Sequence, residues 1–92
     1  MKSGTTDRFW KCYDQVPADV KKQAKEAYRL FQVNPHHPSL HFKRIHSTRP
    51  IFSVRISRNY RAVGVLHEDE ILWFWIGPHA EYDRLVKSMR RA

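Results

Sequence analysis

The chain is 92 residues long, which suffices for one domain with a modest hydrophobic core and is too short for two cores. Its formal net charge is +8, with 17 Lys and Arg against 9 Asp and Glu, which favours a polyanionic partner: nucleic acid first, an acidic protein second. The single cysteine excludes an intramolecular disulfide and is typical of a reducing compartment, and no apolar run approaches the ~20 residues that span a bilayer. We therefore expect residues 1–92 to form a single soluble domain in the cytoplasm.

The N-terminal third of the sequence predicts two helices. Residues 1–5 are polar and are either frayed or a short edge strand. Thr6 or Asp7 can cap a helix over residues 7–15, although the apolar positions there also alternate as in a strand. After a break with a proline, apolar residues spaced by three and four predict an amphipathic helix over residues 18–33.

Three segments with strand character follow at residues 51–56, 60–66 and 71–76, separated by short polar breaks that suit hairpin loops. The first has one apolar and one mixed face, and the third is apolar on both faces, as expected of a strand that is covered on both sides. Trp73 and Trp75 in the third segment could stack on bases, but core packing is the stronger interpretation. The pattern predicts an antiparallel meander.

A C-terminal helix is predicted over about residues 79–90, directly after Gly77 and Pro78. Its apolar positions recur at helical spacing and are Tyr82, Leu85, Val86 and Met89. Its charged residues, acidic in the first turn and basic in the last, are Glu81, Asp83, Lys87, Arg90 and Arg91. This order of charges complements the helix dipole.

The middle of the chain is basic without interruption, because no acidic residue lies between Glu26 and Glu68. The same interval carries five histidines and the basic residues Arg29, Lys43, Arg44, Arg49, Arg55, Arg58 and Arg61. The clustering predicts a surface that binds nucleic acid or an acidic protein, whereas solvated cationic loops are the plainer interpretation.

The paired histidines at positions 36 and 37 invite a metal hypothesis, which the surrounding sequence does not favour. Neither cysteine nor carboxylate lies near His36 and His37, and their spacing matches no usual zinc pattern. The chain also has no glycine-rich phosphate loop. We expect no metal and no cofactor.

His79 lies at the point where the third strand segment gives way to the last helix. Histidine can act as base or acid at neutral pH, and a helix N-terminus adds backbone N–H groups that suit an anion. The plainer alternatives are a helix cap for His79 and a core position for Tyr82. For Arg61 the plainer alternative is an ion pair with Glu68 or Glu70.

Four segments together carry a resemblance to a known family. They are residues 53–56 (SVRI), 59–62 (NYRA), 73–77 (WFWIG) and 79–82 (HAEY). With the order of the predicted elements, they make the chain resemble the RelE/ParE superfamily of toxins from bacterial type II toxin–antitoxin modules. The resemblance implies an α+β fold in which an N-terminal helical hairpin packs on a small antiparallel sheet and a C-terminal helix closes the domain.

The resemblance also implies a function: ribosome-dependent cleavage of messenger RNA by attack of the RNA's own 2′-hydroxyl, without a metal or a protein nucleophile. Arg61, His79 and Tyr82 match positions of the family, and with Glu81 they are the predicted catalytic residues. Arg55 matches a basic position of the family, and with Lys43, Arg44 and Arg58 it is predicted to bind RNA. The implied partners are an acidic antitoxin, the ribosome and messenger RNA.

Departures from the RelE pattern keep other functions open: a short hairpin loop before Tyr60, a tight spacing from His79 to Tyr82, and one residue on the first strand of the meander. The RelE branch has a second lysine on the first strand of the meander, where this chain has Ser53. The ParE branch, which poisons DNA gyrase without cutting RNA, therefore remains an alternative, as does an RNA-binding module without activity.

Overall fold

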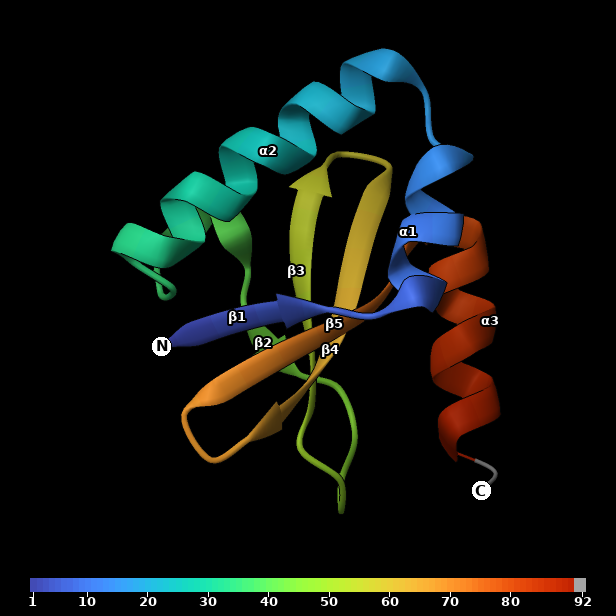
Figure 1. The fold of residues 1–92 in the computed structure, drawn as a ribbon. Coiled ribbons are helices and arrows are strands. Elements are labelled where there is room, and N and C mark those ends of the chain that lie inside the picture. Colours follow the sequence, from blue (N-terminus) through green and yellow to red (C-terminus); the bar gives the residue numbers. More distant parts are fainter. Residues whose placement is uncertain (91–92) are drawn as a thin grey trace.

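The computed structural model describes residues 1–90, and the predicted meander lies at its centre (Figure 1). Five strands form one sheet in the order β1-β5-β4-β3-β2. The strands are β1 (Lys2–Thr5), β2 (Lys43–Arg44), β3 (Ile51–Ser57), β4 (Tyr60–His67) and β5 (Glu70–Pro78). The helices are α1 (Asp7–Asp14), α2 (Ala18–Val33) and α3 (His79–Arg90), with a single 3-10 turn at η1 (Pro38–Leu40). The α+β class is confirmed.

The strands β3, β4 and β5 pair antiparallel, as the predicted meander requires. The prediction of a wholly antiparallel sheet is wrong in one respect, because β1 pairs with β5 in parallel and makes the sheet mixed. β1 is the short edge strand that was one of two alternatives for residues 1–5, and one side-chain and one backbone hydrogen bond to Trp73 help to hold it there. The indole N–H of Trp73 donates to the hydroxyl of Ser3 at 3.0 Å, and the backbone N–H of Thr6 donates to the carbonyl of Trp73 at 3.1 Å.

The predicted helix boundaries hold, and local chemistry explains them. The Thr6 hydroxyl accepts a hydrogen bond from the backbone N–H of Phe9 at 3.1 Å, which caps α1 and decides for helix over strand in this segment. α2 covers the whole predicted range and ends at Val33, followed by Asn34 as its C-cap and then by a proline. α3 begins at His79, and Arg91, which we expected in its last turn, lies outside the described residues.

One face of the sheet is covered by α2. The core on this side contains Phe31 from the helix, Val54 and Ala62 from the meander, and Trp73 from β5. The rings of Phe31 and Trp73 meet edge to face with centroids 5.4 Å apart, a favourable arrangement for an aromatic pair. Trp73 is therefore a core residue, as expected, and not a platform for bases.

The other face is covered by α3, whose Tyr82 packs on Ile51, Val63 and Trp75. Both faces of β5 are thus buried, which confirms the reading of its apolar sequence. α1 packs mainly on β5, and α2 packs mainly on β3 (Figure 1). None of the helices described has the length and apolar content needed to cross a membrane.

A β-bulge in β5 places its two tryptophans on opposite faces. Val63 is opposite Trp75 but Gly64 is opposite Trp73, so Phe74 is an extra residue without a partner on β4. Simple alternation would put Trp73 and Trp75 on one face; the extra residue shifts the alternation, and they lie in different core clusters. The bulge needs Gly64, because a Cβ there would lie 2.8 Å from the Trp73 ring.

Candidate functional site

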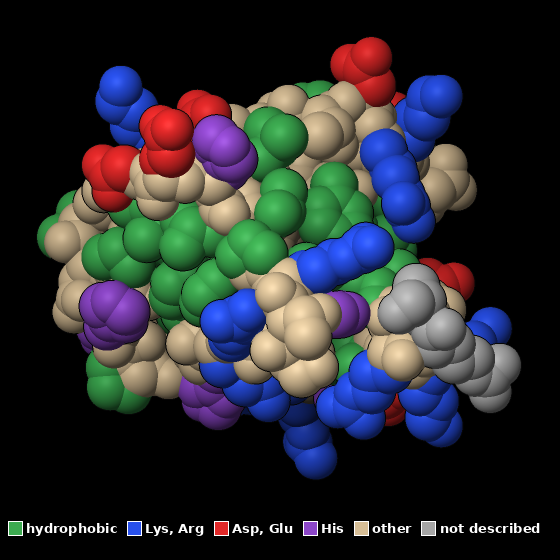
Figure 2. Space-filling model, turned by 90° about the horizontal axis from the view of Figure 1, so that it is seen from below, with side chains coloured by type: hydrophobic (Ala, Val, Ile, Leu, Met, Phe, Trp, Pro, Cys, Tyr) green, Lys and Arg blue, Asp and Glu red, His purple; other side chains and the backbone are tan. Residues whose placement is uncertain are grey.

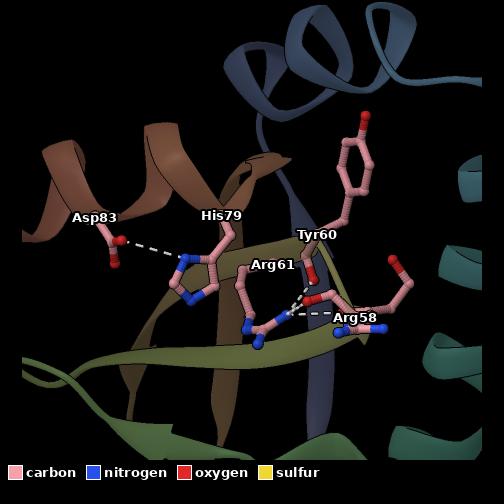
Figure 3. Close-up of polar contacts among 6 residues, drawn as sticks. Arg58, Tyr60, Arg61, His79 and Asp83 are labelled. Carbon is pink, nitrogen blue, oxygen red and sulfur yellow. Dashed lines mark hydrogen bonds and ion pairs between the residues drawn. The ribbon is translucent and has the colours of Figure 1, made fainter.

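The site lies at the corner where the hairpin between β3 and β4 meets the first residue of α3 (Figure 3). The backbone N–H of His79 donates to the carbonyl of Asn59 in the hairpin turn at 2.7 Å. This bond joins the start of the helix to the turn that carries Arg58 and leads into Arg61. The bond thereby holds together two segments that lie 20 residues apart in the sequence.

Arg61 is fixed by the turn that precedes it. Its Nη1 donates to the carbonyl oxygens of Ser57 at 2.7 Å and Tyr60 at 2.9 Å, with a longer contact to Arg58 at 3.4 Å (Figure 3). The alternative of an ion pair with Glu68 or Glu70 is wrong, because the only ion pair among residues 1–90 is between His79 and Asp83. A guanidinium held on one nitrogen keeps a fixed position and is well suited to receive an anion on its other nitrogens.

Arg55 lies directly opposite Arg61 on the neighbouring strand. Burial, and then the positive charge of Arg55, lower the pKa of Arg61 from its ordinary value, while the charge of Asp83 acts in the opposite direction. Like charges placed opposite each other in a sheet destabilise it. The pair is therefore unfavourable for folding alone, and a bound phosphate would relieve the repulsion.

His79 is half exposed and its ring has two neighbours. Its Nδ1 is 3.2 Å from a carboxylate oxygen of Asp83, one helical turn later, and its ring centroid is 5.7 Å from that of Tyr82. The side chains of His79 and Asp83 are 46% and 55% exposed. The imidazole thus faces solvent on the same corner as Arg61 (Figure 3).

Tyr82 lies beneath the site and not in it. The residue is only 8% exposed, and its hydroxyl donates to the hydroxyl of Ser53, which is 2% exposed, at 3.1 Å. The plainer alternative, a core position, is thus what the structure shows. Because the hydroxyl is engaged with Ser53 and the ring lies next to that of His79, we expect Tyr82 to support the site and not to take part in the chemistry.

The structure gathers some of the remaining predicted residues and separates others. Arg58 is exposed in the hairpin turn, and a carboxylate oxygen of Glu81 lies close to Gly77, the partner of Arg61 across β4 and β5. Lys43 is opposite Ser53 and so lies on the face that carries the site.

Arg44 is the exception among the predicted RNA-binding residues. It pairs with Phe52 and belongs to the other face of the sheet. Its Nε donates to the carbonyl oxygens of His46 and Arg49, at 2.9 Å and 3.2 Å. Arg44 therefore holds the loop between β2 and β3 together and lies apart from the site.

Asp83 is a residue of this corner that was not among the predicted site residues. Acidic residues in the first turn of a helix interact favourably with the helix dipole, and this was the plainer explanation of Asp83 in the sequence. A separation of four residues from His79 was visible as a signal, because such residues are neighbours on a helix surface. Only the structure shows that the two side chains meet.

Seen from below, several Lys and Arg side chains lie along the lower part of the molecule, with others at its upper left and upper right, and acidic side chains lie mainly along the upper margin (Figure 2). Within residues 1–90, no group of three or more His, Cys, Asp or Glu side chains could hold a metal ion.

Two hollows lie away from the cationic corner. The larger, of about 810 Å³, opens between α1, α2 and the sheet, and Trp10 and Tyr28 at its margin are 49% and 43% exposed. The smaller, of about 500 Å³, lies beside α3, near Arg8 and Arg49. An apolar groove of the first kind is typical of a protein interface.

Comparisons with known proteins agree with this geometry. The family model of the ParE-like toxin domain matches residues 18–84. The RelB–RelE antitoxin–toxin complex from Methanococcus jannaschii contains a similar fold, with a TM-score of 0.72, 20% identity, and coverage of 88% of this chain and 96% of that one. The isolated RelE toxin of E. coli has a TM-score of 0.65 at 15% identity, covering 96% and 97% of the two chains.

The YoeB/ParE toxin from Agrobacterium tumefaciens is similar as well, with a TM-score of 0.67, 16% identity, and coverage of 86% of this chain and 99% of that one. A search among curated proteins gave no significant match. The fold is thus the one that these toxins share. The family model covers well over half of the sequence, and the chain belongs to the ParE-like toxin domain family, the toxins of toxin–antitoxin systems.

Proposed function

We propose that the chain is a metal-independent endoribonuclease that cleaves messenger RNA on the ribosome. The observation that carries the proposal is the pair of opposed arginines, Arg55 and Arg61, beside the half-exposed imidazole of His79. Two cations on neighbouring strands suit a phosphate, and the histidine supplies a group that exchanges a proton at neutral pH.

The chemistry requires no group that the chain does not carry. The 2′-hydroxyl of the RNA attacks the adjacent phosphorus, so the protein only has to stabilise charge and move protons. In this proposal Arg61 neutralises the scissile phosphate and His79 takes the proton from the hydroxyl. Arg55, Arg58 and Lys43 hold the flanking phosphates, and the exposed Glu81 assists in proton transfer.

The test is RNA cleavage in the presence of ribosomes. Removal of Arg61 as Arg61→Ala should slow cleavage by about 10²–10³-fold and His79→Ala by about 10²–10⁴-fold, as for other stabilising and acid–base groups. The matched control is Lys22→Ala, which removes a cation from the exposed face of α2, far from the site. The products should carry a 2′,3′-cyclic phosphate, and a 2′-deoxy nucleotide at the cut should abolish cleavage. Full activity of the Arg61→Ala, His79→Ala double variant would refute the proposal.

A second candidate, inhibition of DNA gyrase without RNA cleavage, is favoured by one observation. Ser53 stands where the RelE branch has a lysine, and it is buried under Tyr82, so the site has one cation fewer on that strand. The two functions differ in the first process that stops after induction. Arrest of translation supports the endoribonuclease, and DNA damage with filamentous growth supports the gyrase inhibitor.

We also propose an acidic antitoxin as the partner, with the cytoplasm as the site of action. The similar proteins from Methanococcus jannaschii and Pyrococcus horikoshii are RelB–RelE complexes. An acidic segment across Arg55, Arg58 and Arg61 would mask the cations, and the groove beside Trp10 and Tyr28 offers an apolar anchor.

The salt dependence of the complex separates its two parts. If the apolar groove is the anchor, the complex should persist in high salt and weaken in the variant Trp10→Ala. If only the cations bind, high salt alone should dissociate it. Failure of the protein encoded beside this one to co-purify at low salt would contradict the proposed partner.

A further inference from the structure

A carboxylate lies within the cationic corner, where it opposes the binding of a phosphate. The Asp83 oxygen is 3.2 Å from Nδ1 of His79, and its negative charge favours the protonated form of Arg61, raising the pKa that burial and Arg55 lower. Nucleic-acid sites are built from cations, because each phosphate contact displaces counterions from the backbone. An acid at this position therefore weakens RNA binding and needs another explanation.

Stability does not supply that explanation. Both side chains of the pair are about half exposed, and an exposed ion pair four residues apart on a helix contributes little to folding. Since α3 is also held by the burial of Tyr82 against the sheet, it does not depend on Asp83. The contact has to be judged by what it does to the imidazole.

Three contacts restrain His79. Its backbone N–H donates to the Asn59 carbonyl at 2.7 Å, and the centroid of its ring lies 5.7 Å from that of Tyr82. Tyr82 is itself locked by its bond to Ser53. The third restraint is Asp83 at Nδ1, and because a carboxylate only accepts, this contact selects the form of the ring with its hydrogen on Nδ1.

We propose that Asp83 is a positioning residue, which holds His79 with its hydrogen on Nδ1 so that Nε2 is left to accept the proton of the RNA 2′-hydroxyl. The inference rests on the proposed endoribonuclease function. In the step, the 2′-oxygen forms a bond to phosphorus while the bond to the 5′-oxygen breaks. The hydroxyl proton passes to Nε2, and the departing 5′-oxygen takes a proton from water.

The direct test follows the ring nitrogens of His79 without RNA. The ¹⁵N chemical shifts of the imidazole distinguish hydrogen on Nδ1 from hydrogen on Nε2. At a pH where the ring is neutral, the parent should show mainly the Nδ1–H form. Asp83→Ala should lose it, and Asp83→Asn should keep most of it, because an amide oxygen can still accept from Nδ1. Glu26→Ala, on the exposed face of α2, is the control of equal charge and should change nothing at His79.

The second test is the split between kcat and KM for RNA cleavage on ribosomes. Asp83→Ala should lower kcat by about 10- to 100-fold, by analogy with the loss seen when the carboxylate partner of a metal-bound histidine is removed. KM should fall in the same variant, because a negative charge near the phosphates is gone. Asp83→Asn should lower KM as well but keep most of kcat.

The outcomes separate this inference from the function on which it rests. If Asp83→Ala lowers KM while kcat and the ¹⁵N spectrum stay as in the parent, Asp83 is only a charge and the inference is overturned. If the spectrum changes as expected but neither parent nor variant cleaves RNA, the contact with His79 is supported and the endoribonuclease proposal fails.

Discussion

The hydrogen bond between Tyr82 and Ser53 offers the sharpest test of the placement of Tyr82. The change is Tyr82→Phe, which removes one oxygen and leaves the ring in its place on Trp75, Val63 and Ile51. If Tyr82 is a core residue that supports the site, the change should reduce stability and leave the chemistry largely intact. If its hydroxyl reaches the RNA, the reverse should hold.

The magnitude follows from the burial of the partner. Ser53 is 2% exposed, so its hydroxyl cannot turn to water when the Tyr82 hydroxyl is removed. Leaving a buried polar group without its partner costs about 1–3 kcal/mol. For a domain of this size, each kcal/mol lowers the melting temperature by roughly 4–8 °C. Tyr82→Phe should therefore melt well below the parent.

A double-mutant cycle with Ser53→Ala isolates the bond from other effects. Each single variant leaves one hydroxyl unpaired, whereas the double variant removes both and leaves no orphan. The double variant should thus lose less free energy of unfolding than the two single variants lose together, with a difference of about 1 kcal/mol or more. Urea denaturation followed by tryptophan fluorescence measures the free energy of unfolding of all four proteins.

The cleavage assay supplies the result that would refute the reasoning. A Tyr82→Phe variant with the stability of the parent and about 10²-fold or more loss of cleavage would mean that the hydroxyl acts on the substrate as an acid or base. The burial of Tyr82 would then have to change when RNA binds. A destabilised variant that still cleaves at a similar rate below its melting temperature agrees with the supporting role.

Three further predictions follow from other parts of the structure. Gly64→Ala should destabilise the domain by about 1–3 kcal/mol, because the new methyl meets the Trp73 ring beside the bulge, whereas Gly4→Ala on the edge strand should cost much less in the same denaturation experiment. Arg58→Ala should raise KM and reduce the salt dependence of RNA binding more than it lowers kcat, and an equal loss in kcat alone would contradict its role in holding phosphates. Cleavage should survive EDTA at concentrations that leave ribosomes intact, and rescue by zinc of an EDTA-inactivated protein would contradict a metal-independent mechanism.

The sequence by itself determined the elements, because the signals for them are local. The alternation in residues 51–56, the apolar run before Gly77 and the spacing of apolar residues in α2 each depend on neighbours within a few positions. The start of α3 at His79 was predictable for the same reason, since Gly77 and Pro78 end the strand character. These local signals predicted the helices, the meander and the change from strand to helix at His79, and the α+β fold followed from the family resemblance.

The tertiary structure alone decided how the elements combine. The parallel pairing of β1 depends on the bond from Trp73 to Ser3, 70 positions earlier. A short polar strand carries no signal in its sequence of whether it pairs parallel or antiparallel. The bulge at Phe74 moves Trp75 to the face of α3, and the uninterrupted apolar run of this strand carries no signal of the bulge. The same folding buries Tyr82 on Ser53, because a hydroxyl on an apolar stripe finds its partner only across the sheet.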